Sequence, residues 1–547
     1  MRSAQQESAV QAVLDAVRSG AGRCILLDAV AGAGKTHTLL EMVQAVRTQR
    51  PQARILCLAF NLEMARQLRE RLGLVGEDRH GPLEVYTLHA YGMRLCEEHP
   101  PPPDDDDDDN APLPPPPKRP RQRRAVTVDP DKAYRTWRRQ VGPGPSPHAW
   151  ASVRAVVDRL RQEGEEEEGE DEAVAWAVVR AMVAERRVVD LEDQIYHPVV
   201  HRLALRPDEQ YDLVLVDESQ DLNRATHRFL RECVVPVGAR TVLCAVGDPM
   251  QAIYAFRGAD PDSMERLAET FGGGGGAVQR LRLTWCFRCP RRILFLASQI
   301  SAVIRPAPGA PRGRVRVITT DTPFETVLQL HAAAAGDDGP TVLLARGNAV
   351  LLDFLAHVYA QVGGGGAAAA APPLRWVSPG VQRTVEAARE ESPPGCTLGG
   401  CLARLRAAVQ VDRTMVRIVS TAARLDGPAT PVDRSRWLAW LGDALRPAPT
   451  GGGGGAALVV ATVHAVKGQE YRHVILYEYN LFGHQMMDTD HPQEQNLLYI
   501  ALTRSTETLT LLMHRRTRAV VSPFLPIEMV HYSTELWREE TEKREGV

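Results

Sequence analysis

The feature that most limits how this chain can fold is a glycine-rich turn between a strand and a helix. Cys24-Ile25-Leu26-Leu27 is typical of a buried strand, the sequence AVAGAGKT follows at 29–36, and residues 38–47 look helical. Such a turn binds phosphate because its backbone amides and the helix N-terminus both face the anion. Ala29 stands where the usual pattern has glycine. The flanking strand and helix still favour a phosphate site over a chance Gly-Lys-Thr turn.

Each position of this turn has an expected role. Gly32 and Gly34 let backbone N–H groups approach phosphate oxygens, Lys35 reaches the β- and γ-phosphates, and Thr36 can bind Mg²⁺. The predicted cofactors are therefore ATP and Mg²⁺. The residues predicted to bind the phosphates are Ala31, Gly32, Ala33, Gly34, Lys35, Thr36 and His37.

A second strand ends in two carboxylates. The sequence YDLVLVDE at 211–218 is an apolar run that finishes on Asp217 and Glu218. Paired acids at a strand end are usually only a solvated terminus. With a phosphate loop earlier in the chain, we expect Asp217 near the metal bound by Thr36 and Glu218 near an attacking water.

Short apolar runs recur along the chain and predict parallel sheets. The first set lies before the glycine run at 272–276 and the second lies after it, which predicts two α/β domains. Further glycine runs at 363–366 and 451–455 are typical of flexible connectors. The runs that predict strands are 24–27, 54–58, 213–216, 241–246, 341–344, 457–460 and 509–512.

Composition adds two constraints. The 547 residues carry 65 basic and 68 acidic side chains, a net charge of −3, so nucleic-acid binding must be argued locally. Two acidic stretches, 104–109 and 163–172, hold much of the negative charge. The basic cluster at 118–124 lies in a proline-rich segment that cannot supply a core. It is a nuclear import signal, a nucleic-acid contact or a solvated charge run, and these alternatives stay open.

Cysteine use and hydropathy favour an intracellular protein. The nine cysteines are scattered and odd in number, which is typical of reduced thiols. Cys286-x-x-Cys289 could form half a zinc site, but no second pair has ligand spacing. The chain has no signal-peptide core and no apolar run of membrane length, so we expect a soluble protein, placed in the nucleus if the basic cluster acts as an import signal.

With DESQD at 217–221 in view, the sequence resembles the superfamily 1 DNA helicases of the UvrD/Rep type, and within them the F-box DNA helicase branch, although no F-box-like segment precedes Gln6. The segment SAQQESAV at 3–10 is similar to the adenine-reading motif, in which Gln6 would bond the base. GDPMQAIYAFRGA at 247–259 resembles motif III and is the longest match. There, Gln251 would sense the γ-phosphate.

The second half of the chain resembles the same family. LTWCFR at 283–288 occupies the place of motif IV, without its usual asparagine, so Phe287 would stack on adenine and Arg288 would be an arginine finger. TVHAVKGQEY at 462–471 resembles motif V, in which Glu470 would contact the ribose. EQNLLYIALTR at 494–504 resembles motif VI, whose Arg504 would be a second arginine finger.

The resemblance also implies a path for single-stranded DNA. Two motifs that carry it, 58–61 and 86–90, would read as core on their own and gain weight from their order along the chain. Aromatic rings suit this role because base stacking tolerates any sequence. The residues expected to contact nucleic acid are Phe60, Asn61, Thr87, His89, Tyr254, Phe256, Arg257, Arg346, Asn348, Thr462 and His464.

The implied fold class is α/β, with two RecA-like P-loop NTPase domains built on parallel sheets, each with an inserted accessory subdomain. Residues 1–95 and 205–278 would form the first domain, and 279–374 with 456–525 the second. The other expected parts are an insertion at 96–204, with a Pro/Asp/basic loop at about 100–124, a shortened insertion at 375–455 and a tail at 526–547.

The implied function is an ATP-dependent helicase or translocase that moves 3′ to 5′ on single-stranded DNA in repair, replication or recombination. Expected partners are single strands, single/double-strand junctions and replication or repair proteins, and the chain would act as a monomer. Two alternatives stay open: a translocase that removes proteins without unwinding, and a scaffold that binds without hydrolysis. The tail after 523 is too short for a fused nuclease. A small-molecule kinase would not need motifs III, V and VI.

Overall fold

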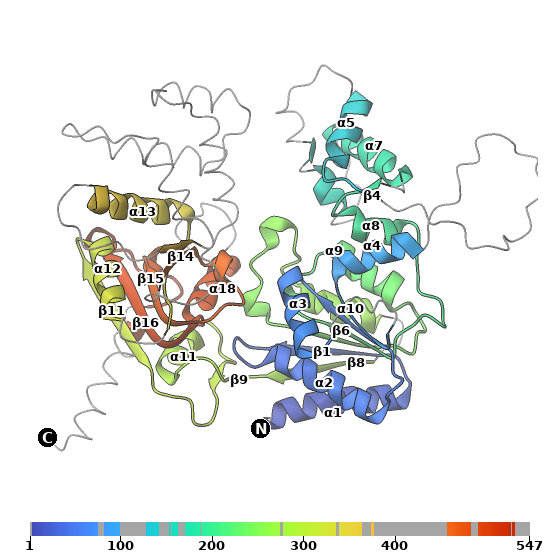
Figure 1. The fold of residues 1–547 in the computed structure, drawn as a ribbon, viewed down its shortest axis with the longest axis horizontal. Helices are drawn as coiled ribbons and strands as arrows, with labels where there is room; N and C mark the ends of the chain where they lie inside the picture. Colours follow the sequence, from blue (N-terminus) through green and yellow to red (C-terminus); the bar gives the residue numbers. More distant parts are fainter. Residues whose placement is uncertain are drawn as a thin grey trace, which may run out of the picture. The chain divides into compact units, whose positions relative to one another are not determined.

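The computed structural model describes residues 3–74, 81–98, 127–141, 153–154, 156–161, 170–185, 188–273, 277–334, 339–363, 374–376, 457–482, 491–526 and 528–530. The chain forms two compact units, Met1–Ala29 with Gly34–Leu283, and Val30–Ala33 with Thr284–Val547. Each unit is described by itself below (Figure 1).

Unit 1 is an α/β unit with one large sheet. Its six strands lie in the order β3-β2-β6-β7-β1-β8, and every neighbouring pair is parallel. The strands are β1 (Arg23–Ala29), β2 (Ile55–Ala59), β3 (Leu83–Thr87), β6 (Leu213–Val216), β7 (Val242–Gly247) and β8 (Ala277–Leu283). The helices are α1 (Ala4–Ser19), α2 (Lys35–Gln49), α3 (Leu62–Arg71), α4 (Leu88–Glu98), α8 (Asp193–Val200), α9 (Arg224–Phe229) and α10 (Ser263–Gly272). Short turns of helix are η1 (Ser219–Asp221), η2 (Leu230–Val234), η3 (Pro249–Gln251) and η4 (Ala255–Arg257).

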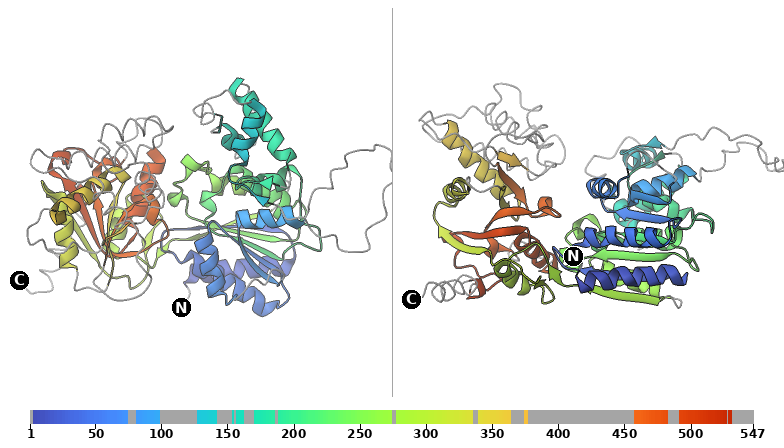
Figure 2. Two further views of the ribbon diagram at one scale, coloured as in Figure 1. Left: turned by 45° about the horizontal axis from the view of Figure 1, so that its top comes forward. Right: turned by 60° about the horizontal axis from the view of Figure 1, so that its bottom comes forward.

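Helices cover both faces of this sheet, as parallel strands require. Helices α1 and α2 lie on one face and α4, α9 and α10 on the other (Figures 1 and 2). Side chains alternate accordingly along β7: Cys244 faces Met42 of α2, with the two sulfurs 3.9 Å apart, whereas Leu243 and Ala245 join the core of the opposite face.

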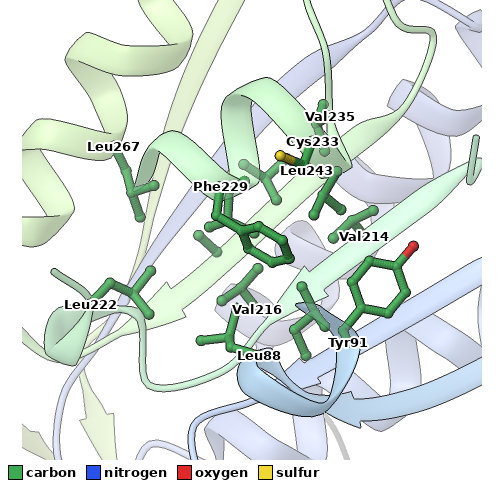
Figure 3. Packing of buried hydrophobic residues seen from close by; sticks show 14 of the residues in the cluster. Leu88, Tyr91, Val214, Val216, Leu222, Phe229, Cys233, Val235, Leu243 and Leu267 are labelled. Carbon is green, nitrogen blue, oxygen red and sulfur yellow. The ribbon is translucent and has the colours of Figure 1, made fainter. Parts of the chain in front are cut away.

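Phe229 of α9 lies within that core and is fully buried. Figure 3 shows its ring among Leu88, Tyr91 and Val216, with Leu267 and Cys233 nearby. The Tyr91 ring meets Phe229 edge to face, with the ring centroids 6.4 Å apart. This cluster joins α4, α9 and α10 to the strand that carries the two carboxylates, so it fixes the sheet edge on which the site is built.

The insertion between α4 and β6 contains α5 (Lys132–Val141), α7 (Glu170–Ala184) and a two-stranded sheet of β4 (Thr127–Val128) and β5 (Val188–Val189). Trp137 is buried in a cluster with Val157, Val179 and Tyr196. Beside it lie buried charges: Lys132 Nζ and Arg161 Nη2 are 2.8 and 3.0 Å from the two oxygens of Asp193.

Helix α8 belongs to two cores at once. Ile195 and Val199 pack into the core against the main sheet, and Tyr196 packs into the cluster around Trp137. Asp193, at the start of the same helix, holds Lys132 and Arg161. The insertion is therefore joined to the sheet through a shared helix.

Unit 2 has a second six-stranded parallel sheet, in the order β11-β16-β15-β12-β14-β13. The strands are β11 (Arg314–Thr320), β12 (Thr341–Ala345), β13 (Leu374–Trp376), β14 (Leu458–Thr462), β15 (Tyr471–Tyr477) and β16 (Ser505–His514), and a small sheet pairs β9 (Trp285–Cys286) with β10 (Arg305–Pro306). Helical elements are α11 (Arg291–Ser298), α12 (Pro323–Ala333), α13 (Asn348–Gly363), α18 (His491–Leu502), η5 (His464–Val466), η6 (Tyr479–Leu481) and η7 (Arg515–Thr517). Phe354 of α13 and Val327 of α12 pack with Leu343 and Ile475 of the sheet.

The predicted α/β class, with parallel sheets in two units, is confirmed. Each predicted apolar run lies within one of the strands above or starts one residue before it. In the two large sheets, sequence reasoning missed the outer strands β3, β8, β11 and β13 and the inner strand β15. The arginines of β8 and β11 interrupt the apolar pattern on which the prediction depended. The basic cluster at 118–124, nearly all of the insertion at 375–455 and most of the tail lie outside the described residues.

Within the described ranges, no helix is long and apolar enough to cross a membrane. No group of three or more His, Cys, Asp or Glu side chains there is arranged to hold a metal ion.

Candidate nucleotide and DNA site

The phosphate loop has the backbone that its glycines permit. Gly32 and Gly34 have φ of 69° and 80°, the left-handed region that favours glycine. Gly34 is the N-cap of α2, and no side chain caps that helix. The first-turn amides of α2 therefore face outward without a side-chain acceptor, which suits an anion. Thr36 lies in this turn, and His37 is half exposed, 3.9 Å from Glu41.

Gln6 lies beside this loop. Its backbone N–H donates to Ser3 Oγ at 3.2 Å, and its Oε1 accepts from Ser3 N at 2.9 Å, a capping box that begins α1. A Cβ added to Gly34 would lie 2.9 Å from Gln6 Nε2. The cap thus fixes an amide side chain against the phosphate loop, where a side chain on residue 34 would not fit.

The lysine and the two carboxylates meet at the carboxyl ends of the strands. Lys35 Nζ lies 2.9 Å from Glu218 Oε2, and Asp217 Oδ1 accepts the Glu218 N–H at 2.9 Å. Burial raises the pKa of Asp217 to about 7, with Glu218 adding to the effect and Lys35 opposing it. Burial lowers the pKa of Lys35, but Glu218 and the other nearby carboxylates outweigh it and raise the pKa overall. This set suits a divalent cation and a phosphate oxygen.

Glu218 has a strained backbone, with φ of 52° at the turn from β6 into η1. Glu478 repeats this device in unit 2, with φ of 51° at the turn from β15 into η6. Tyr477 stands there in the place that Asp217 has in unit 1. A glutamate with left-handed backbone is therefore a feature of both units. What distinguishes Glu218 is the presence of Lys35 and Asp217 beside it.

Motif III continues from the same edge. Asp248 follows β7, accepts the Met250 N–H at 3.1 Å and accepts from Gln251 Nε2 at 2.7 Å. Gln251 is buried. One residue that sequence reasoning did not select joins this turn to the carboxylates: Gln220 Nε2 donates to Glu218 Oε2 at 2.6 Å. Its place two residues after Glu218 was the only signal in the sequence.

The aromatic residues of the 58–61 segment and of motif III form one cluster. The rings of Phe60 and Tyr254 stack with centroids 5.9 Å apart and planes 8° apart, and Phe256 lies 6.1 Å from Tyr254. The Arg257 guanidinium lies over both rings, 5.3 Å from the Tyr254 centroid and 5.4 Å from that of Phe256. Phe256 is 65% exposed. An exposed ring beside a cation is suited to base stacking.

The other predicted DNA residues of unit 1 have clear local roles. Asn61 caps α3 by accepting the Met64 N–H at 2.9 Å. Thr87 ends β3, and its Oγ1 accepts the Ala90 N–H at 3.1 Å. Burial lowers the pKa of His89. The contacts of Asn61 and Thr87 position the turns at which these two residues lie.

Unit 2 brings two predicted nucleotide residues together. Arg288 Nε donates to Glu470 Oε1 at 2.6 Å, and Arg288 Nη1 lies 3.4 Å from Thr503 O. Phe287, the adjacent residue, is 51% exposed. Cys286 and Cys289 bracket these two residues and are buried free thiols, with Cys289 N donating to Cys286 Sγ at 3.4 Å.

Arg504 is more enclosed, with 1% of its surface exposed. Its guanidinium donates to Ile500 O at 3.1 Å and to Gln469 O at 3.0 Å, and lies 3.3 Å from Thr503 Oγ1. Arg288 and Arg504 are thus linked through Thr503 and through the 469–470 segment.

The remaining predicted DNA residues of unit 2 lie at the ends of β12 and β14 or in the helical elements that follow them. Arg346 follows β12 and donates to Glu494 Oε1 at 2.7 Å. Asn348 begins α13, and its Oδ1 is buried without a hydrogen-bond partner. Thr462 ends β14, and His464 begins η5.

The fold and this geometry are those of two RecA-like P-loop domains, and comparisons with known proteins refine the class. Residues 8–257 match the family model described as an AAA domain, and residues 457–512 match the UvrD-like helicase C-terminal domain. With the relatives described next, these matches show that the chain is similar to superfamily 1 proteins of the UvrD/Rep type.

The chain is similar to bacterial helicases. It is 26% identical over 306 residues to the ATP-dependent DNA helicase Rep of Salmonella typhimurium, covering 52% of this chain and 42% of that protein. It is 26% identical over 293 residues to DNA helicase II of Escherichia coli, covering 50% and 38%. It is 26% identical over 312 residues to the ATP-dependent DNA helicase UvrD1 of Mycobacterium tuberculosis, covering 51% and 38%. The matched regions span less than half of each relative.

Proposed function

We propose that the protein is an ATP-dependent DNA helicase or translocase that moves along single-stranded DNA. The observation that carries the proposal is the ion pair between Lys35 Nζ and Glu218 Oε2, which are 2.9 Å apart. Asp217 is buried beside this pair, and Lys35 begins α2, whose N-terminus has no side-chain cap. A phosphate loop, a metal-binding acid and a base at one sheet edge are the parts that nucleotide hydrolysis needs. The similar proteins are named as DNA helicases, which supports DNA as the nucleic acid along which the protein moves.

In this proposal the residues of unit 1 bind and cleave ATP. Lys35 and the amides of the α2 N-terminus would bind the phosphates, and Thr36 with Asp217 would hold Mg²⁺. The metal ion would neutralise charge on the β- and γ-phosphates. Glu218 would orient and deprotonate the attacking water, and Gln251 would contact the γ-phosphate. The side chain of Gln6 would bond the adenine edge.

The residues of unit 2 would complete the reaction and couple it to movement. Arg288 and Arg504 would act as arginine fingers, Phe287 would stack on the adenine, and Glu470 would contact the ribose. Cycles of binding and release would close and open the two domains, so that contacts with the DNA alternate. The direction of movement would be 3′ to 5′.

We expect single-stranded DNA to raise the ATP turnover of the wild type strongly. We expect no such rise in Lys35→Ala or in Arg504→Ala. Losing Lys35 removes a charge that binds the phosphates, at a cost of about 100-fold or more in kcat. An arginine finger contributes about 10³-fold or more. A steady-state phosphate-release assay measures both. Because Arg504 is buried, its replacement can also affect folding. Arg504→Lys is therefore measured beside Arg504→Ala, and circular dichroism checks the fold of each protein.

Three outcomes separate the competing functions. A wild type that binds DNA but does not hydrolyse ATP would be a scaffold. A wild type that displaces streptavidin from a biotinylated strand, but leaves tailed duplexes intact, would be a translocase that removes proteins. Duplexes with a 3′ or a 5′ overhang test both unwinding and its direction, and unwinding only from the 5′ overhang would contradict the proposed polarity.

We expect Phe60→Ala to weaken binding of single-stranded DNA by about 1–3 kcal/mol, because the stacked Phe60–Tyr254 pair would lose one of its rings. Fluorescence anisotropy with a labelled oligonucleotide measures the change. Phe324→Ala is a matched control, since its ring packs against Phe354 and Tyr477 in unit 2. Equal DNA affinity of Phe60→Ala and wild type would remove Phe60 from the path.

A further inference from the structure

Gln220 joins two turns of unit 1 that carry the proposed hydrolysis residues. Its Nε2 donates to Glu218 Oε2 at 2.6 Å and to Asp221 Oδ2 at 3.1 Å, and its Oε1 accepts the Asp248 N–H at 2.9 Å. The side chain is 1% exposed. A single buried amide therefore spans from the carboxylate at the end of β6 to the backbone at the end of β7.

The chemistry of the three partners fixes which way this amide points. A backbone N–H needs an acceptor, so the Gln220 oxygen faces Asp248. Carboxylates need donors, so the NH₂ group faces Glu218 and Asp221. Glutamate at this position would lose the donor and place a third carboxylate in the group. Methionine would keep the length and lose all three hydrogen bonds.

The residues around Gln220 pack closely against it. A Cβ added to Gly247 would lie 2.7 Å from Gln220 Oε1 and 3.0 Å from Gln220 N, so the close approach needs glycine. On the other side, Ser263 Oγ donates to Ser219 O at 2.6 Å, and His227 Nε2 lies 2.9 Å from Ser263 Oγ. Both turns are therefore held against the amide.

We propose that Gln220 is a positioning residue for ATP hydrolysis. Its side chain couples the position of the Glu218 carboxylate to that of the Asp248 turn. Asp248 accepts from Gln251 at 2.7 Å, and the same loop continues to Tyr254, which stacks on Phe60. The orientation of Glu218 thus depends on the loop that ends at the aromatic cluster. This inference rests on the proposed function, since it assigns Gln220 a part in that reaction.

The first test separates kcat from KM in Gln220→Met and Gln220→Asn, a shorter amide that cannot span both turns. We expect kcat with single-stranded DNA to fall about 10- to 100-fold, as for a reacting group displaced by about 1 Å, with little change in the KM for ATP. Arg228→Ala is the control, since it removes only an exposed ion pair with Glu232. Gln220→Asn carries the test if Gln220→Met does not fold.

The second test is a double-mutant cycle with Glu218→Gln, measured by single-turnover cleavage of radiolabelled ATP. If Gln220 acts through the Glu218 carboxylate, Gln220→Met costs little further once that carboxylate is gone. Additive losses, or a normal kcat in folded Gln220 variants, would overturn the inference. A wild type without ATP turnover would instead contradict the proposed function, so the two failures are distinguishable.

Discussion

Replacing Glu218 with glutamine is expected to lower the kcat for ATP by about 10²- to 10⁴-fold and to leave the affinity for ATP nearly unchanged. A positioned general base contributes about that factor to a reaction. Glutamine keeps the volume, and its amide oxygen can still accept from Lys35, which lies 2.9 Å from Glu218 Oε2. Steady-state phosphate release gives kcat, single-turnover cleavage gives the rate of the chemical step, and a fluorescent ATP analogue gives the affinity.

Glu478→Gln is the matched control for this experiment. Glu478 has the same residue type and nearly the same φ, 51° against 52°, and it also stands between a parallel strand and a short helical turn. It lacks the neighbouring lysine and aspartate of unit 1. We expect normal turnover in this control. A Glu218→Gln protein that hydrolyses ATP at the wild-type rate would exclude Glu218 as the base.

The second large effect is on stability: Asp193→Ala is expected to lower the free energy of unfolding of unit 1 by about 3–5 kcal/mol. Asp193 is fully buried and lies 2.8 Å from Lys132 Nζ and 3.0 Å from Arg161 Nη2. Its removal leaves two buried cations with less compensating charge, which costs more than the lost contacts. Urea unfolding measures the change.

Arg206→Ala provides the comparison, because it breaks an exposed ion pair with Glu209 that we expect to contribute at most about 1 kcal/mol. Hydrogen exchange would locate the effect: protection should fall first in α5, α7 and α8, whose residues surround Trp137. If both variants unfold at the wild-type urea concentration, the buried charges contribute no net stability.

The sequence allowed the nucleotide half of the site to be predicted because its parts are local. The strand, the glycines at 32 and 34, and Lys35 occupy one short stretch, so their geometry follows from nearest neighbours. Asp217 and Glu218 follow from the apolar strand before them. Ala29 stands in place of glycine, and its φ is not in the left-handed region, so the backbone there does not need glycine.

The rest depends on contacts between distant residues. Lys132 and Arg161 read as ordinary charges on helical segments, and nothing near them indicates that Asp193 lies within 3.0 Å of both. Gln220 reads as one polar residue in an acidic turn, and only the parallel pairing of β6 with β7 brings Asp248 to it. The roles of Arg288 and Arg504 stay predictions.

Helix α8 has a consequence for how the insertion can respond to a load. Ile195 and Val199 are embedded on the sheet side, and Tyr196 on the insertion side. A swivel of the insertion about this helix would expose apolar surface on one side or the other, at about 25 cal/mol per Å². We therefore expect a force on the helices around Trp137 to be transmitted to the main sheet through α8, with little bending between the two.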